Sequence, residues 1–250
     1  MRLKFLAIIP ARGGSKEIKN KNLIKINNKP LLSYSIESAK KSKFIDRIVV
    51  STDNKNIMRV SKNFGAEIIM RPKNISGDKA KVEDAILHAL NYLKIKKKYI
   101  PDYIVLLQPT SPLRKKKEVD KVIKKLLKSK ADSIFTSISL HPSIWKWSKN
   151  FTIPILNKQF NNPIHYIDRQ KLPETLIANG SIYVTKKKIF EKTRTRVGGK
   201  VTTYKMEPIS FIEIDSKQDL KILKTIINKK TINKLNLVEP KHVRKKSLSH

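Results

Sequence analysis

The chain has 250 residues, 39% of them hydrophobic, which is enough apolar material for one substantial domain with a buried core. It contains no cysteine, and this excludes disulfides, thiolate metal sites and cysteine nucleophiles. No apolar run approaches the ~20 residues of a membrane span and no secretory leader opens the chain, so we expect a cytoplasmic protein with no membrane partner.

The formal net charge of +35 is typical of proteins that bind nucleic acid, because lysines release counterions from phosphate backbones. The lysines recur in nearly every segment, however, rather than in one patch. This distribution favours a solvated surface of biased composition, and a nucleic-acid-binding protein is the alternative. In either case the field of the protein should attract small polyanions.

Short apolar runs alternate with amphipathic stretches through the first 137 residues. Strands are predicted at 4–10, 47–51, 66–70, 103–108 and 132–137. Helices are predicted from about Leu31, from a cap at Asp53 or Asn54 to a stop at Gly65, across 82–93 and across 119–126. This alternation favours the three-layer α/β/α class, in which helices cover both faces of a mostly parallel sheet.

Ligands of such sheets bind outside the carboxyl ends of the strands. Four features of the chain follow predicted strands in this way: the loop 10–22, Asp53, Arg71 and the segment after Leu107. We therefore expect them along a single rim of the sheet.

The regular pattern breaks between about 138 and 178, a region with both tryptophans, several prolines and no helical stripe. We interpret it as an excursion from the sheet, such as a dimerisation arm. Strands resume at 180–184, 201–206 and 211–215, and Ser216 with Asp219 resembles a capping box that begins a last helix. The domain is expected to end near Asn228, followed by a basic, frayed tail over 229–250.

The loop after the first strand is rich in glycine and positive charge. It matches neither the Walker A pattern nor GxGxxG. Gly13 and Gly14 allow the backbone to approach an anion, and Ser15 offers a hydroxyl. Arg12, Lys16 and Lys21 supply positive charge for phosphate from the same loop. A lysine-rich surface loop with a flexible turn is the alternative.

The segment FIEID (211–215) is predicted to be a strand with two carboxylates on one face. Glu213 and Asp215 would then lie roughly 6–7 Å apart. Mg²⁺ favours one or two carboxylates together with substrate phosphates, so the pair is a candidate magnesium site. Alternatively, the two carboxylates neutralise nearby lysines.

Seven segments carry further information through their order and spacing. They are IPARGGSKEIKNKNL (9–23), VVSTDN (49–54), MRP (70–72), LLQPTSPLR (106–114), RQKLP (169–173), NGSIYV (179–184) and IEIDS (212–216). In this order they resemble the motifs of the acylneuraminate cytidylyltransferases, which make CMP-activated nonulosonic acids such as CMP-N-acetylneuraminate. The resemblance covers roughly residues 4–228.

The resemblance implies a Rossmann-like nucleotidyltransferase that transfers CMP from CTP to the anomeric hydroxyl of a nonulosonic acid and releases pyrophosphate, with Mg²⁺ as cofactor. It also implies that the excursion reaches into a second subunit, so that the partners are CTP, the sugar acid and a second copy of the chain. By residue, it implies catalytic roles for Arg12, Lys21, Gln108 and Asp215, nucleotide binding by Arg12, Ser15, Lys16, Lys21, Asn22 and Arg71, sugar binding by Gln108, Arg169, Gln170, Asn179 and Tyr183, and metal binding by Asp215 and Glu213.

Five positions depart from the family pattern. Glu17 replaces a glycine beside the phosphate loop, and Glu213 replaces an aspartate. Asp168, Ile144 and Ile177 stand where some relatives carry basic residues near the sugar. These changes leave the acceptor open among N-acetylneuraminic, legionaminic, pseudaminic and Kdo acids, although the ARGGSK loop and RQKLP argue against Kdo. A basic nucleic-acid-binding protein on an inactive fold is the alternative from another class.

Overall fold

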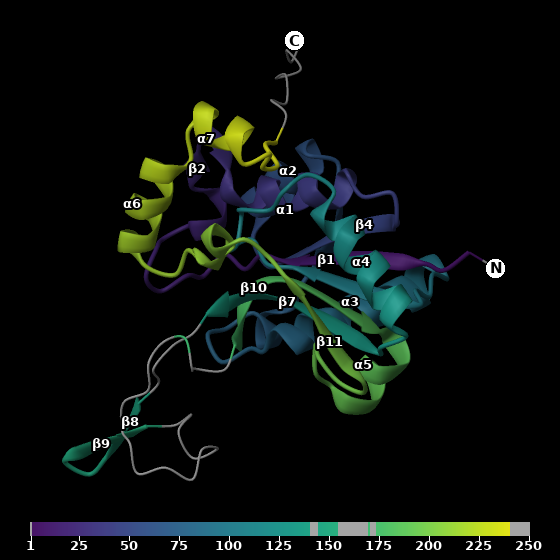
Figure 1. The fold of residues 1–250 in the computed structure, drawn as a ribbon. Coiled ribbons are helices and arrows are strands. Elements are labelled where there is room, and N and C mark those ends of the chain that lie inside the picture. Colours follow the sequence, from purple (N-terminus) through teal and green to yellow (C-terminus); the bar gives the residue numbers. More distant parts are fainter. Residues whose placement is uncertain (1, 141–144, 155–169, 171–173, 241–250) are drawn as a thin grey trace, which may run out of the picture.

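The computed structural model describes residues 2–140, 145–154, 170 and 174–240, and its centre is a seven-stranded sheet in the order β11-β7-β10-β6-β1-β4-β5 (Figure 1). In chain order these strands are β1 (Phe5–Pro10), β4 (Ile45–Thr52), β5 (Glu67–Met70), β6 (Tyr103–Leu107), β7 (Ser133–Leu140), β10 (Thr175–Lys186) and β11 (Val201–Lys205). Within this sheet β10 pairs antiparallel with β6 and β7, whereas the other pairings are parallel. The predicted mostly parallel sheet is therefore confirmed.

The first strand shows why its sequence is apolar throughout. Successive side chains of a strand point to opposite faces, and β1 buries both sets. Ala7 and Ile9 join one apolar cluster, while Leu6 and Ile8 join another on the opposite face. Continuous burial of this kind is the property of a central strand with layers on both sides.

Helices cover both faces of the sheet, as predicted. The longer ones are α1 (Leu31–Lys40), α2 (Lys55–Asn63), α3 (Val82–Lys97), α4 (Glu118–Ser129), α5 (Lys187–Thr193) and α6 (Lys217–Ile226). Apolar residues of α1, α2 and α4 pack in the cluster that contains Ala7, and those of α3 and α5 pack in the cluster that contains Leu6. The resulting three layers are the predicted α/β/α class.

Two predicted helix signals are seen in detail. The Asn54 side chain accepts hydrogen bonds from the N–H groups of Asn56 and Ile57 and so caps α2, with Gly65 at φ +85° just beyond its end. The Ser216–Asp219 capping box begins α6. Asp53, the other candidate cap, is used differently, as described below.

The segment 211–215 is not a strand, and that prediction is wrong. Pro208–Phe211 forms a 3-10 helix, η5, and the residues after it have no ladder partner among the described strands. Pro208 favours this helical turn because its φ is fixed and the first turn needs no N–H donor from it. The run that follows is tied instead by the Ile214 N–H, which donates to the Thr110 carbonyl at 2.9 Å.

The chain stays folded beyond Asn228, so the predicted start of the frayed tail is wrong. Residues 229–234 form α7 (Lys229–Lys234), and Ile232, Leu237 and Val238 are at most 3% exposed. Ile232 and Leu237 join a third apolar cluster that also contains Ile18 of the glycine-rich loop and Ile214. The alternation rules could not find this packing because the segment is short and its apolar positions are few.

A two-stranded hairpin stands away from the body of the molecule (Figure 1). It consists of β8 (Trp145–Ser148) and β9 (Phe151–Pro154), and it follows β7, whose end lies beside the start of β10. The described residues 145–154 of the predicted excursion therefore lie outside the main sheet, while β7 continues to Leu140 and β10 already begins at Thr175.

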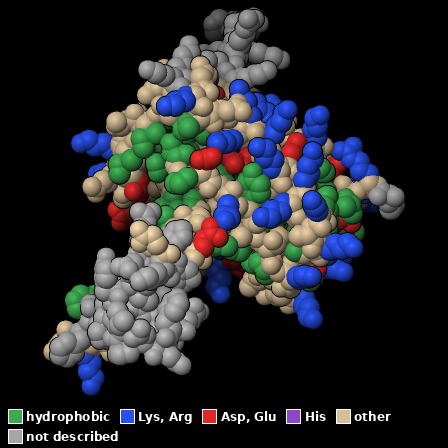
Figure 2. Space-filling view, viewed as in Figure 1, with side chains coloured by type: hydrophobic (Ala, Val, Ile, Leu, Met, Phe, Trp, Pro, Cys, Tyr) green, Lys and Arg blue, Asp and Glu red, His purple; other side chains and the backbone are tan. Residues whose placement is uncertain are grey.

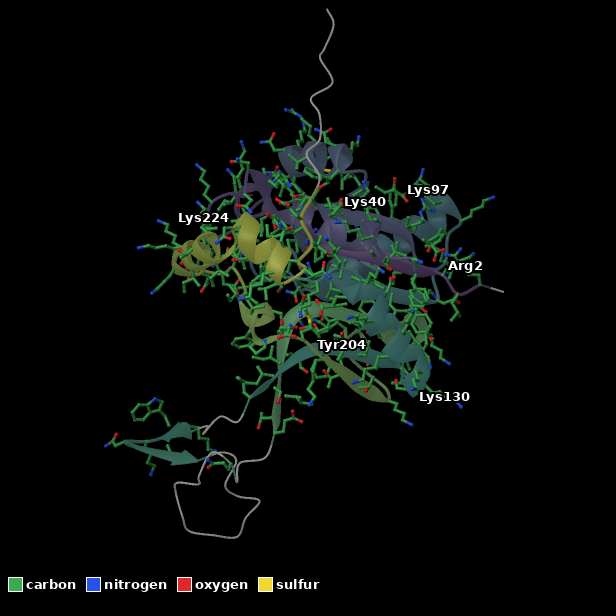
Figure 3. All side chains as sticks on the ribbon, turned by 45° about the horizontal axis from the view of Figure 1, so that its top comes forward. Arg2, Lys40, Lys97, Lys130, Tyr204 and Lys224 are labelled. Atoms are coloured by element: carbon green, nitrogen blue, oxygen red, sulfur yellow. The ribbon has the colours of Figure 1, made fainter. Side chains whose placement is uncertain are left out.

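Positive charge is spread over the surface. Lys and Arg side chains occupy much of the face in Figure 2 and are interrupted there by hydrophobic and acidic side chains. In Figure 3, Arg2, Lys97, Lys130 and Lys224 point outward from different parts of the molecule. Within the described residues, no helix has the length and apolar character that a bilayer crossing requires.

Candidate active site

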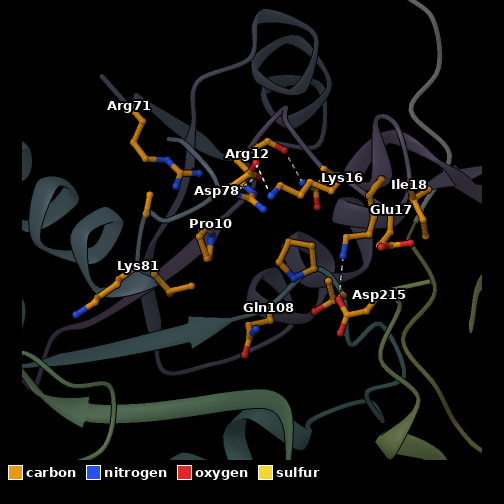
Figure 4. A pocket seen from close by; sticks show the side chains of 17 residues that line it. Pro10, Arg12, Lys16, Glu17, Ile18, Arg71, Asp78, Lys81, Gln108 and Asp215 are labelled. Atoms are coloured by element: carbon orange, nitrogen blue, oxygen red, sulfur yellow. Dashed lines mark hydrogen bonds and ion pairs between the residues drawn. The ribbon is translucent and has the colours of Figure 1, made fainter. Parts of the chain in front are cut away.

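The main pocket lies where the parallel strands end. It has a volume of about 450 Å³ and takes lining residues from the ends of β1 and β6, the segment after β5 and the loop after η5. It brings together eight of the predicted catalytic and binding residues: Arg12, Ser15, Lys16, Lys21, Asn22, Arg71, Gln108 and Asp215 (Figure 4). The predicted rim is thus the edge of a real cavity.

The glycine-rich loop is fastened to the neighbouring strand end. The Gly13 N–H donates to the Asp53 carboxylate at 2.8 Å, and the Asn22 side-chain amide donates to the Arg12 carbonyl at 2.9 Å. A Cβ at Gly13 would lie 2.7 Å from the Asn54 amide nitrogen. Gly13 is therefore required for close packing against the cap of α2, which differs from its expected role in approaching an anion.

Three cations of this loop face carboxylates. Arg12 Nη1 and Lys16 Nζ each lie 3.2 Å from a carboxylate oxygen of Asp78, and Lys21 Nζ lies 2.9 Å from Asp215 Oδ1. Lys21 begins η1 (Lys21–Leu23), the 3-10 turn in which the loop ends. The site therefore has the cations that a polyphosphate needs, each held in place by a negative partner.

Arg71 supplies a buried cation on the other side of the pocket. It is 8% exposed, and its Nη2 donates to the Ser51 carbonyl at 3.0 Å, while its Nε is buried with no hydrogen-bond partner. Burial lowers the pKa of Arg71, and the nearby Arg12 lowers it further, although Asp53 opposes both effects. A guanidinium has five N–H donors, and the one bond to Ser51 leaves others, the Nε–H among them, for a ligand.

Gln108 is positioned by Arg114, the last residue of the LLQPTSPLR segment. The main-chain carbonyl of Gln108 accepts hydrogen bonds from Ser35 Oγ at 3.2 Å and from Arg114 Nη2 at 2.8 Å. Arg114 is fully buried and also donates to Ser35 Oγ and to the Ser181 carbonyl. It therefore joins α1, β6 and β10 at the wall of the pocket, and burial lowers its pKa to about 9.

Glu213 turns toward Ser111. Ser111 Oγ donates to Glu213 Oε1 at 3.1 Å, and a Cβ at Gly180 would overlap that same carboxylate oxygen. Burial raises the pKa of Glu213, with a further contribution from the charge of Asp215. The longer side chain at this position is thus accommodated by a glycine, which has φ +65°.

Among the described residues, the predicted sugar-binding residues Gln170, Asn179 and Tyr183 do not line this pocket. Asn179 has no exposed surface: its amide donates to Ser210 Oγ at 2.8 Å, and its oxygen accepts from Thr136 Oγ1 at 2.6 Å. Tyr183 is partly buried and lies under the guanidinium of Arg196, 5.6 Å from ring centroid to carbon. Gln170 is exposed, and Arg169, Asp168 and Ile144 lie outside the described residues.

A family model described as "Cytidylyltransferase" matches residues 6–232. The chain belongs to the cytidylyltransferase family. This accounts for the position of the pocket and for the order of the motifs, and it confirms the family resemblance of the sequence.

Three curated relatives match between 54% and 98% of the chain. The N-acylneuraminate cytidylyltransferase of Escherichia coli O18:K1:H7 (strain RS218 / NMEC) is 30% identical over 98% of this chain and 57% of its own length. The post-translational flagellin modification protein B of Campylobacter coli is 27% identical over 92% of this chain and 97% of its own length. A pseudaminic acid cytidylyltransferase of Campylobacter jejuni (serotype O:23/36, strain 81-176) is 38% identical over 54% of this chain and 58% of its own length. The chain therefore spans little more than half of the first of these relatives.

Solved structures share the fold at low sequence identity. A CMP:2-keto-3-deoxy-manno-octonic acid synthetase complexed with CTP has a TM-score of 0.63 and 17% identity, covering 89% of this chain and 97% of that one. A 4-diphosphocytidyl-2C-methyl-D-erythritol synthase has a TM-score of 0.65 and 11% identity, covering 90% and 98%. These similarities support the nucleotidyltransferase fold of the family.

A divalent metal would find one suitable carboxylate at this site. The Asp215 side chain is 69% exposed and lines the pocket, and it has Lys21 as its ion-pair partner. The described residues contain no group of three or more His, Cys, Asp or Glu side chains that could hold a metal by themselves. One carboxylate is nevertheless enough for Mg²⁺ when substrate phosphates supply other ligands, so Asp215 fits that ion.

Three residues line the pocket although the sequence analysis did not predict them there. Glu17, the departure beside the phosphate loop, is exposed and lines the pocket. Asp78 and Lys81 also line it, but neither belongs to a motif that sequence reasoning selected. Their position after β5 was the available signal, because that segment follows Arg71 at the same rim.

Proposed function

We propose that this chain transfers CMP from CTP to the anomeric hydroxyl of a nonulosonic acid such as N-acetylneuraminate and releases pyrophosphate. The observation that carries the proposal is the gathering of Arg12, Lys16 and Lys21 from one loop at the carboxyl rim of a cytidylyltransferase-family sheet. Such a loop suits the triphosphate, whose charge the three cations would balance.

The nucleotide would lie across the pocket from the loop to Arg71. Arg12, Lys16 and Ser15 are assigned to the outer phosphates, and Lys21 to the charge that builds up as pyrophosphate leaves. Asn22 is assigned to positioning the loop, because its side-chain amide donates a hydrogen bond to the Arg12 carbonyl. Arg71, with its unused buried Nε, is assigned to the nucleoside end.

In the reaction, the anomeric oxygen attacks the α-phosphorus in line with the bond to the bridging oxygen. The new phosphorus–oxygen bond forms as the bond to pyrophosphate breaks, and the hydroxyl proton passes to solvent. Most of the rate gain would come from positioning and from stabilisation of the departing charge. No described side chain is assigned as a unique general base.

Mg²⁺ is proposed as the cofactor, with Asp215 as its protein ligand. When bound, it would neutralise phosphate charge and lower the pKa of the attacking hydroxyl. Lys21 would then exchange its Asp215 partner for phosphate oxygens. Glu213, the other predicted ligand, contacts Ser111, and its part in metal binding is tested by a variant described below.

The acceptor acid is proposed to bind beside Gln108. Two hydrogen bonds fix the main-chain carbonyl of Gln108, and its side-chain amide would bind hydroxyl groups of the acid. Gln170, Arg169, Asn179 and Tyr183 stay predictions of the family resemblance. Two relatives are named for N-acylneuraminate and pseudaminic acid, so these are the first acceptors to test, followed by legionaminic and Kdo acids.

We also propose a homodimer that forms through the arm between 138 and 178. Its support is the hairpin β8–β9, which stands away from the body and carries Trp147 with 78% of its surface exposed. A reaction that consumes CTP is further expected in the cytoplasm, where nucleoside triphosphates are made.

The nucleotide assignment is tested by calorimetric titration with CTP, UTP, ATP and GTP in the presence of Mg²⁺. CTP should bind most tightly, and Arg12→Ala should weaken it by about tenfold or more while the melting temperature stays near that of the parent chain. Equal binding of all four nucleotides would contradict the assignment. Lys188→Ala is a matched control, because Lys188 is exposed on α5, outside the pocket.

A further inference from the structure

The side chain of Asp78 contacts both outer cations of the glycine-rich loop. One of its carboxylate oxygens lies 3.2 Å from Arg12 Nη1 and the other lies 3.2 Å from Lys16 Nζ. Arg12 Nη1 also donates to the carbonyl of the neighbouring Gly77 at 2.8 Å. In Figure 4, Asp78 lies among the cationic groups that line the pocket. An internal anion thus occupies the position proposed for the outer phosphates.

The segment that carries Asp78 is anchored at its ends and open in the middle. On one side Ser76 is 8% exposed and its Oγ donates to the Pro72 carbonyl, and on the other side α3 begins at Val82. Gly77 and Asp78 themselves are exposed, and Gly77 has open space around its Cα. The tip can therefore shift without loss of buried packing.

The ion pairs that Asp78 makes are weak enough to be exchanged. The side chains are 45% exposed in Asp78, 32% in Arg12 and 73% in Lys16. Ion pairs with this much solvent access contribute little, so a polyphosphate with several negative charges can replace one carboxylate. A ligand that does not reach Arg12 and Lys16 has no such contact to replace.

We propose that Asp78 is a specificity-determining residue that competes with the outer phosphates of the nucleotide for Arg12 and Lys16. The inference rests on the proposed function for the identity of the nucleotide, but not for the competition itself. Ligands with a pyrophosphate group displace the Asp78 carboxylate from Arg12 and Lys16, and ligands without one leave these ion pairs in place. It also favours release of pyrophosphate, because the carboxylate returns to the cations.

The test compares Asp78→Asn with the parent chain by calorimetric titration of CTP, inorganic pyrophosphate and cytidine in low salt. Asparagine keeps the size of the side chain and removes its charge. CTP and pyrophosphate should bind about two- to tenfold more tightly to the variant, and cytidine should bind equally to both. The gain should shrink in high salt, and Asp78→Glu should restore the parent affinities.

Glu191→Gln is the matched control for net charge. Glu191 is also 45% exposed and pairs with a lysine, but it lies on α5. Unchanged or weaker pyrophosphate binding by Asp78→Asn, or an equal gain in Glu191→Gln, would overturn the proposal. A different result would contradict the proposed function: a parent chain that binds pyrophosphate but does not prefer CTP among nucleotides. The competition between Asp78 and pyrophosphate can still be measured in that case.

Discussion

Lys21 and Asp215 are 194 positions apart in the sequence, yet Lys21 Nζ lies 2.9 Å from Asp215 Oδ1. Lys21 lies at the end of the glycine-rich loop and Asp215 lies just before α6, so this contact joins the N-terminal loop to the C-terminal part of the domain at the pocket. Ile18 and Ile214, which lie near them in the chain, pack in one apolar cluster. This apolar packing holds the two segments that carry Lys21 and Asp215 next to each other.

Asp215→Asn tests the role of this carboxylate. The variant should fold normally, because the side chain is 69% exposed, and should lose about 10²-fold or more in kcat with CTP and Mg²⁺. Stopped-assay measurement of pyrophosphate gives the rate, and circular dichroism checks the fold. A variant with parental kcat would remove Asp215 from the proposed mechanism.

Glu213→Gln separates a buried structural carboxyl from a metal ligand. Because burial raises the pKa of Glu213 above its ordinary value, the folded state binds its proton more tightly than the unfolded state does. The charged form therefore opposes folding as the pH rises through the folded pKa. Glutamine can still accept from Ser111, so the variant should be as stable as the parent chain or more stable at pH 7, and this gain should vanish in acid.

Thermal melts from pH 4 to 8 measure the stability of Glu213→Gln, and pyrophosphate release measures its activity. Retained kcat and retained dependence on Mg²⁺ are the expected results. A loss as large as that of Asp215→Asn would instead show that both carboxylates act on the metal.

Asn179→Ala should destabilise the fold rather than weaken acceptor binding. The amide has no exposed surface, and its loss deprives Thr136, Ser210 and Met206 of a common partner. We expect the free energy of unfolding in urea to fall by about 1–3 kcal/mol. The KM for the sugar acid should stay within about twofold at a temperature where the variant is folded. A large rise in KM with unchanged stability would place Asn179 in the sugar site.

Leu237→Ala tests the packing of the segment after α6. Leu237 is 2% exposed and shares its cluster with Ile18 and Ile214, so we expect a loss of about 2–4 kcal/mol in unfolding free energy. CTP affinity should also fall in the folded variant because Ile18 lies in the nucleotide loop. The exposed Lys234 gives the control Lys234→Ala, which should change neither property. A variant with full stability would mean that this segment contributes nothing to the core.

The sheet and its pocket could be predicted because both depend on local rules. Continuous apolar strands such as 5–10 need layers on both faces, and the carboxyl ends of parallel strands share one edge. Arg12, Lys21, Arg71 and Gln108 each follow or end a strand, so the topology alone brings them together. Asp215 was selected by the alternating pattern of 211–215 and by the motif resemblance, and it lines the pocket although its segment is not a strand.

The remaining features depend on contacts between distant residues. Arg114 is followed by a lysine run and gave no sign of complete burial, because its partners Ser35 and Ser181 come from other elements. The alternating pattern of 211–215 matched a strand, but the described sheet offers it no open edge beside Thr110. Asp78 has no motif of its own, and its role follows only from its distances to Arg12 and Lys16.

The most direct measurement is pyrophosphate release from CTP and Mg²⁺ with N-acetylneuraminic, pseudaminic, legionaminic and Kdo acids offered separately. We predict release with one of the three nonulosonic acids, together with an equal amount of the CMP-sugar and little release without acceptor. Arg12→Ala should abolish the signal. Absence of release with every acid, from folded protein that also fails to bind CTP, would contradict the proposed function.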